Sequence, residues 1–165
     1  MLDGLERATR AISLAALWFA GAGLVAMTAV IGWQVVARYG LKASPAWSEQ
    51  AALVLMIWYV LPAAAAGVRE GFHIRITAGV DAMPARLGKA ARLFSHAVVA
   101  VFGAALAYWG GELVARTWSH VIPTLGLPRG FAYLPMPLSG ALIVLFAFEQ
   151  MLADMRGRTV EPSWN

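Results

Sequence analysis

Charged residues are absent from four long stretches of this chain, and these stretches dominate its pattern of hydrophobic and polar positions. The longest covers 11–37, which is 27 residues, and the other three cover 50–68, 93–111 and 130–148, each 19 residues long. A helix rises about 1.5 Å per residue, so 19 residues reach about 28 Å, close to the ~30 Å hydrocarbon core of a bilayer. The pattern therefore predicts an all-α integral membrane protein with four transmembrane helices.

We expect these helices to cover about residues 11–38, 48–68, 92–115 and 134–153 of a single transmembrane domain, 1–165. The first helix exceeds the hydrocarbon thickness by about 10 Å, so it should tilt or project beyond the bilayer. Its apolar run is also much longer than the roughly 7–15 residues of a secretory signal, which indicates a retained first span. The helices and their connections nearly fill the chain, so we expect no separate domain outside the membrane.

The distribution of Lys and Arg predicts the orientation of the chain. Nine of these residues lie in the two terminal tails and in the connection between the second and third helices, and four lie in the other two connections. Cytoplasmic loops collect positive charge, so both termini and the middle connection should be cytoplasmic. The last outer connection, 117–133, is too short to span and too apolar for a free linker, so we expect it to fold back onto the outer membrane surface.

Composition supports the membrane assignment and excludes several kinds of chemistry. Hydrophobic residues make up 60% of the chain and charged residues 13%, whereas an ordinary soluble domain has about 25% charged residues. The net charge of +4 follows from the predicted topology rather than from nucleic-acid binding. There is no cysteine, which excludes structural disulfides, thiolate metal sites and dithiol redox chemistry.

Ionisable residues inside a membrane are functional candidates, and here they gather at predicted helix ends rather than at mid-depth. They are Arg38, Glu49, Glu112, Arg116 and Glu149. The plain interpretation is that they reach the interface or pair locally, as Glu112 and Arg116 can at a spacing of four on one helix face. Arg38 and Glu49 flank the same outer turn and can pair across it. The alternative is that some of these residues contact a partner protein.

Histidine supplies the candidates for a haem site. By the predicted topology, His73 and His96 lie on the cytoplasmic side and His120 lies outside. A haem held between helices needs two axial ligands at one depth, and a structural or interfacial role for His73 explains its position better. No nucleophilic triad, phosphate-binding glycine loop or paired-carboxylate site is evident. We therefore expect no enzymatic activity and no cofactor in this chain.

Small residues recur at a spacing of four in the third predicted helix, at Gly103, Ala107 and Gly111. Such a stripe lets another helix approach closely. Pro62 is the only interior helix break, and few polar side chains lie near it, whereas a transporter that binds its own solute at mid-membrane needs polar groups there. These features indicate an accessory membrane subunit that scaffolds, orients or anchors a larger partner.

Five short segments carry a family resemblance. They are 36–39 (VARY), 45–50 (PAWSEQ), 67–76 (GVREGFHIRI), 126–128 (GLP) and 133–137 (YLPMP). In that order, over four spans, the chain resembles the small membrane (Q-type) subunit of tripartite ATP-independent periplasmic (TRAP) transporters. The motifs cover about residues 38–140, and the layout covers the whole chain. No single motif is specific; the ordered set carries the resemblance.

The resemblance implies a bacterial inner-membrane secondary transporter. A periplasmic solute-binding protein would capture an organic acid, and a large membrane subunit would carry the moving transport domain and the sodium sites. The small subunit would scaffold the large one and help to dock the binding protein. The chain departs from the family at Gln50 and Thr77, where an acidic residue is common, so roles that depend on those carboxylates do not carry over.

The resemblance also suggests roles for particular residues. Arg38, Trp47 and Glu49 would form an outer-face cluster that shapes the first hairpin or the surface facing the receptor. Arg69 and His73 would anchor the cytoplasmic loop. The long first helix and the small-residue stripe would be packing surfaces for the partner.

Three other classes remain as alternatives. The first is a haem-binding membrane oxidoreductase subunit, which needs histidines at matched depths. The second is a small multidrug exporter, but such proteins depend on a membrane-embedded acid in the first span, where this chain has only Gln34 as a strongly polar residue. The third is a structural subunit of another complex. The sequence names neither the solute nor the coupling ion, because both would be selected by partner proteins.

Overall fold

The computed structural model describes residues 2–43, 45–71, 84–156 and 160. Four long helices make up most of the described chain, and a small hairpin and a short helix connect the last two of them. The elements in order are α1 (Leu2–Tyr39), α2 (Ala46–Glu70), α4 (Ala85–Thr117), β1 (Val121–Ile122), β2 (Leu127–Pro128), α5 (Arg129–Tyr133) and α6 (Pro135–Met155). Each of the four long helices is long and apolar enough to cross a membrane, which confirms the predicted all-α membrane fold.

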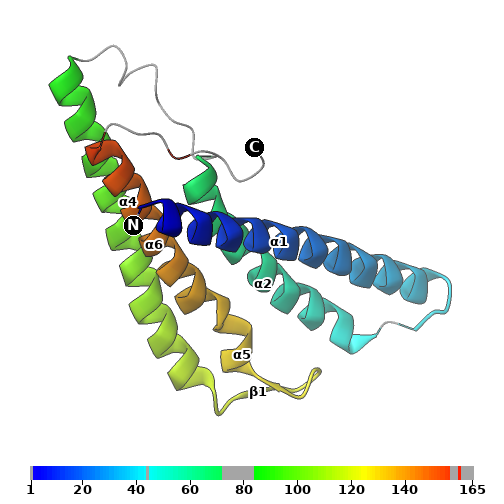
Figure 1. Ribbon diagram of the computed structural model, residues 1–165. Coiled ribbons are helices and arrows are strands. Elements are labelled where there is room, and N and C mark those ends of the chain that lie inside the picture. Colours follow the sequence, from blue (N-terminus) through cyan, green and yellow to red (C-terminus); the bar gives the residue numbers. More distant parts are fainter. Residues whose placement is uncertain (1, 44, 72–83, 157–159, 161–165) are drawn as a thin grey trace.

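The four helices are arranged as two pairs, and the main contact between the pairs is that of α2 with α6. α1 packs along α2, α4 packs along α6, and α2 joins the pairs by packing on α6. Figure 1 shows the two pairs diverging from the end where α1 begins and α6 ends. We call this end the terminal end, and the opposite end, with β1, β2 and α5, the hairpin end.

Prolines and glycines set the ends of the helices. Pro45 and Pro84 immediately precede α2 and α4, where the missing amide proton of proline is not needed. Gly71 ends α2 in the left-handed conformation, with φ of 72°, and its N–H bonds to the carbonyl of Gly67. α1 and α4, with 38 and 33 residues, are both longer than the expected spans, because their polar first turns continue the helix. α2 continues through Pro62 without an interruption.

The connection between α4 and α6 is folded rather than extended. β1 and β2 form a two-stranded antiparallel hairpin, in which Gly126 adopts a φ of +67°. Ile122 is buried with Val54 of α2 and Ala132 of α5. The Trp58 ring of α2 lies 4.9 Å from the Phe131 ring of α5, and its indole N–H donates to the Phe131 carbonyl at 3.2 Å. The connection therefore packs back on the helices at the hairpin end.

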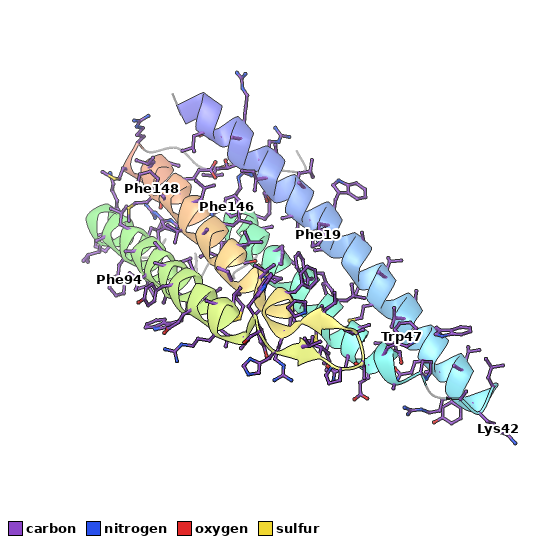
Figure 2. All side chains as sticks on the ribbon, turned by 90° about the horizontal axis from the view of Figure 1, so that it is seen from below. Phe19, Lys42, Trp47, Phe94, Phe146 and Phe148 are labelled. Carbon is purple, nitrogen blue, oxygen red and sulfur yellow. The ribbon has the colours of Figure 1, made fainter. Side chains whose placement is uncertain are left out.

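The contact between α4 and α6 is close because both helices carry glycine there. A Cβ on Gly140 would lie 2.5 Å from the amide nitrogen of Ala107 and 2.7 Å from the carbonyl oxygen of Gly103. Ile143 and the fully buried Phe146 continue this core toward α2. Figure 2 shows Phe146 among the helices. Only glycine allows the backbones to approach this far without displacing one helix.

Candidate functional site

The most polar part of the interior is a group of five side chains at the terminal end. Its members come from α1, α2 and α6, and all of them are buried: Thr9, Ser13, Arg69, Glu70 and Glu149. We call this group the terminal cluster. Three of the five side chains are ionisable. Burying a charged group costs desolvation free energy, which a partner of opposite charge must offset.

Arg69 lies at the centre of the terminal cluster and contacts both carboxylates. Its Nε lies 3.1 Å from Glu149 Oε2, and a terminal guanidinium nitrogen lies 3.4 Å from Glu149 Oε1. Glu70, the next residue in α2, approaches the same guanidinium at 3.6 Å. Arg69 and Glu149 are each 3% exposed, so this two-point contact between α2 and α6 is shielded from solvent. Such paired nitrogens and oxygens fix the relative position of two helices in angle as well as in distance.

Helix α1 joins the terminal cluster through two hydroxyl groups. Thr9 and Ser13 are four residues apart, so both lie on the same face of α1. The Thr9 hydroxyl lies 2.7 Å from Glu149 Oε1 and 2.8 Å from the carbonyl of Leu5. The Ser13 hydroxyl donates to Glu70 Oε1 at 2.5 Å. α1 has only a small contact with α6, and the Thr9 contact is part of it.

A second set of polar contacts joins α6 to α4 and to α2 at the same end. His96 Nε2 lies 2.9 Å from Asp154 Oδ2, and Arg92 approaches the other oxygen of Asp154 at 3.8 Å. Gln150 of α6 donates to the carbonyl of Val68 at 2.6 Å. These contacts are partly exposed, but they extend the connections among the helices around the terminal cluster.

The hairpin end carries the residues that were predicted to form an outer-face cluster. Arg38 and Glu49 both line a hollow of about 330 Å³ between α1 and α2, together with Gln34. Trp47 is 42% exposed beside the turn between these helices, where Figure 2 also shows Lys42. The structure thus brings Arg38 and Glu49 to one hollow, and it leaves Trp47 at the surface nearby.

A larger hollow of about 560 Å³ lies on the other side of α2. It is lined mainly by apolar side chains of α2, the hairpin, α5 and the first turn of α6: Leu53, Val54, Met56, Ile57, Val60, Leu61, Ile122, Pro123, Ala132 and Met136. Its polar lining comes from Gln50, Thr124, Arg129 and Tyr133. Leu53 and Met56 line both hollows, so an exposed edge of α2 separates them.

The small-residue stripe of α4 is largely occupied within this chain. Gly103 and Ala107 lie against Gly140 of α6, as described above. A Cβ on Gly111 would meet no atom within 4 Å. The expected role of the stripe as a packing surface for a partner therefore has room only at Gly111.

The histidines do not form a haem site among the residues that the structure describes. His96 is engaged with Asp154 at the terminal end, and His120 follows α4 at the hairpin end. More than twenty helical residues separate the two, which is about 30 Å along the helix. His73 lies outside the described residues.

One sequence-based expectation is wrong. Glu149 neither reaches the interface nor pairs locally; it is buried against Arg69, which lies 80 residues away in the chain. By contrast, Glu112 and Arg116 do pair along α4, with 2.5 Å between oxygen and nitrogen. The pair at the centre of the terminal cluster was missed because Arg69 and Glu149 each follow the end of a charge-free stretch, where exposure is the usual outcome. The available signal was the Thr9 and Ser13 spacing, which marks a polar face on an apolar helix.

The four span-length, apolar helices, two of which are joined by the buried pair of Arg69 and Glu149, define a multi-pass integral membrane protein. The family described as tripartite ATP-independent periplasmic transporters, DctQ component, matches residues 27–157, which is most of the chain. The chain therefore belongs to this family, and it is a small subunit of a TRAP-type transporter in the inner membrane. The resemblance drawn from the five short segments is confirmed.

Individual relatives agree with this assignment. The chain is 25% identical, over 81% of its length and 77% of the relative's, to the sialic acid TRAP transporter small permease protein SiaQ of Vibrio cholerae. It is 28% identical to the C4-dicarboxylate TRAP transporter small permease protein DctQ of Rhodobacter capsulatus, over 64% of this chain but 47% of that protein. It is 24% identical, over 85% of its length, to 23% of the isethionate TRAP transporter permease protein DctMQ of Oleidesulfovibrio alaskensis.

Proposed function

We propose that this chain is the small permease subunit that scaffolds the large membrane subunit of its transporter during ion-coupled uptake of an organic acid. One observation carries the proposal beyond family membership. Among the described residues, the buried charged side chains are Arg69, Glu70 and Glu149, and they are engaged with one another at one end of the bundle. A subunit that moved a solute itself would place polar groups along the span.

The partners follow from the same proposal. The relatives are named for transport of sialic acid, C4-dicarboxylate and isethionate, which are all organic acids. A periplasmic binding protein would select the acid, and the sodium sites would lie on the large subunit. This chain would hold no cofactor and catalyse no reaction.

The physical role is to remain still while the partner moves. α1 is 38 residues long, or about 57 Å, which is well over the thickness of a hydrocarbon core. The terminal cluster connects α1 to α2 and α6, so a force on one helix is transmitted to the others. A large subunit that slides through the bilayer needs such a static body beside it.

Uptake by reconstituted transporter tests the scaffold role. Uptake of the organic acid into proteoliposomes would be measured under an inward sodium gradient. The vesicles would contain the large subunit, with the binding protein outside, and would be prepared with and without this chain. We expect uptake to fall at least tenfold without the chain, and we expect the two membrane subunits to co-purify in mild detergent. Full uptake by the large subunit and binding protein alone would contradict the proposal, as would transport by this chain alone in vesicles.

The proposed orientation places both termini in the cytoplasm and the hairpin end in the periplasm. The chain contains no cysteine, so single-cysteine variants need no background substitutions. Ser119 and Arg156 are exposed at the hairpin end and the terminal end, respectively. A membrane-impermeant maleimide should label Ser119→Cys in intact spheroplasts and Arg156→Cys only after permeabilisation. The reverse pattern would overturn the orientation.

A further inference from the structure

The exposed edge of α2 between the two hollows is a further feature that needs an explanation. Glu49, Leu53, Met56 and Val60 follow one another at spacings of four, three and four, so they form a single ridge along the helix. Leu53, Met56 and Val60 are 51%, 46% and 39% exposed. The larger hollow lies on one side of this α2 ridge and the smaller hollow on the other.

We propose that the α2 ridge is the face on which the large membrane subunit docks, with one of its spanning helices seated in each hollow. This proposal rests on the proposed function and names the surface that performs it. Helices pack by placing the side-chain ridge of one into the groove of another. In a membrane, where lipid is as apolar as leucine, the attraction comes from close packing and hydrogen bonds, so a ridge between two hollows is a favourable docking shape.

The polar lining of the hollows favours protein over lipid as the occupant. The smaller hollow is lined by Arg38 and Glu49, which lie near the ends of their helices, and by Gln34, which lies inside the charge-free stretch of α1. Polar groups within a span normally face protein, because acyl chains offer no hydrogen bonds. The exposed face of α4 provides the contrast: Phe94 and Phe102 lie in a stretch with no charged residue from Leu93 to Gly111. That face is typical of a lipid-facing surface.

The depth of the larger hollow excludes a soluble partner as its occupant. Its α2 lining runs from Gln50 to Leu61, which is about 16 Å along the helix and more than half of a ~30 Å hydrocarbon core. A binding protein in the aqueous phase cannot follow the ridge that far. The partner is therefore a membrane-spanning chain.

Charge indicates what the partner presents. Arg129 lines the larger hollow, and no acidic side chain does. The helix seated there should offer bulky apolar side chains to Leu53 and Met56 and a carboxylate or carbonyl oxygen to Arg129. The helix in the smaller hollow should offer a hydrogen-bonding side chain to Gln34 or Glu49.

Crosslinking in the assembled complex tests the docking face. A photoreactive group would be attached to single cysteines at Leu53, Met56 and Val60, and to exposed control positions on α4 at Phe94, Val98 and Phe102. We expect the ridge positions to crosslink to the co-expressed large subunit at least tenfold more than the α4 positions. Crosslinking of the ridge only to lipid or to a second copy of this chain would overturn the proposal, and so would stronger crosslinking from α4.

A bulky substitution gives an independent measurement. Met56→Trp should fill the edge of both hollows and lower recovery of the large subunit at least tenfold, whereas Phe102→Trp on α4 should leave recovery unchanged. Wild-type recovery with Met56→Trp would overturn the docking face. If Met56→Trp does not reach the membrane, the cysteine positions at Leu53 and Val60 still decide the question. Failure of the wild-type chain to co-purify with the large subunit would instead contradict the proposed function itself.

Discussion

The two ends of the bundle each carry an Arg–Glu pair, but one pair is buried and the other is exposed. At the terminal end, Arg69 and Glu149 are each 3% exposed and bind each other between α2 and α6. At the hairpin end, the side chains of Arg116 and Glu112 are 75% and 42% exposed and pair along a single helix. Both pairs lie near the ends of apolar helices, so proximity to a helix end does not decide their burial.

The difference follows from how the helices converge. At the terminal end, α1, α2 and α6 meet, and their side chains can surround a guanidinium with carboxylates and hydroxyls. At the hairpin end the helix pairs diverge (Figure 1), and two hollows lie beside α2. One end is closed by its own polar contacts, and the other carries the two hollows in which we propose that the large subunit docks. The predictions below test that contrast.

The largest effect should come from Arg69→Leu. Removing the guanidinium leaves two buried carboxylates without their shared cation, which costs about 3–5 kcal/mol of folding free energy. Glu149→Leu should cost less, because Glu70 still faces Arg69. The measurement is denaturant unfolding of the purified protein in micelles, followed by circular dichroism. Unfolding of Arg69→Leu within about 1 kcal/mol of wild type would show that the terminal end is not closed by this pair.

The next largest loss of stability should come from disturbing the contact between α4 and α6, which runs between the two ends of the bundle. Gly140→Ala places a methyl group 2.5 Å from the backbone nitrogen of Ala107, and relieving that overlap should cost about 1–3 kcal/mol. Gly111→Ala is the matched control, because its methyl group would meet no atom within 4 Å. The same unfolding assay compares the two variants. Equal stability of the two variants would show that the close approach of the α4 and α6 backbones does not contribute to the stability of the fold.

A smaller effect should come from loosening α1 at the terminal end. Thr9→Ala removes a buried hydroxyl from Glu149 and should cost about 1 kcal/mol, since hydrogen bonds between membrane helices are modest. Thr28→Ala is the control, because the Thr28 hydroxyl is exposed and donates to the carbonyl of Leu24 in the same helix. An equal loss of stability in Thr28→Ala and Thr9→Ala would mean that the hydrogen bond to Glu149 adds no more to the free energy of unfolding than a bond within one helix.

The sequence predicted the fold well because helix length in a membrane is set by bilayer thickness. Charge-free stretches of 19 to 27 residues were enough to locate all four helices. One contact at the hairpin end could also be predicted from the sequence, because the i, i+4 pairing of Glu112 and Arg116 depends on one helix alone. The helix ends were less accurate, because polar first turns such as those of α1 and α4 continue the helix without a break in hydrogen bonding.

The terminal cluster was not predicted because its contacts depend on how the helices are assembled. Arg69 and Glu149 are 80 residues apart, and nothing in either local sequence identifies the other as its partner. The same limit applied to the α2 ridge. Leu53, Met56 and Val60 look like ordinary lipid-facing positions until the neighbouring helices show that a hollow lies on each side.

The smallest effect on stability should come from the exposed pair at the hairpin end. Glu112→Ala or Arg116→Ala removes an ion pair in contact with solvent or headgroups, so the unfolding free energy should change by no more than about 0.5 kcal/mol. Because the pair lies on α4, away from the α2 ridge, recovery of the large subunit should also stay at the wild-type level. A loss above about 2 kcal/mol would place this pair with the buried contacts of the terminal end and remove the contrast between the two ends. Wild-type stability together with lost recovery of the large subunit would instead indicate that the large subunit docks on α4 rather than on the α2 ridge.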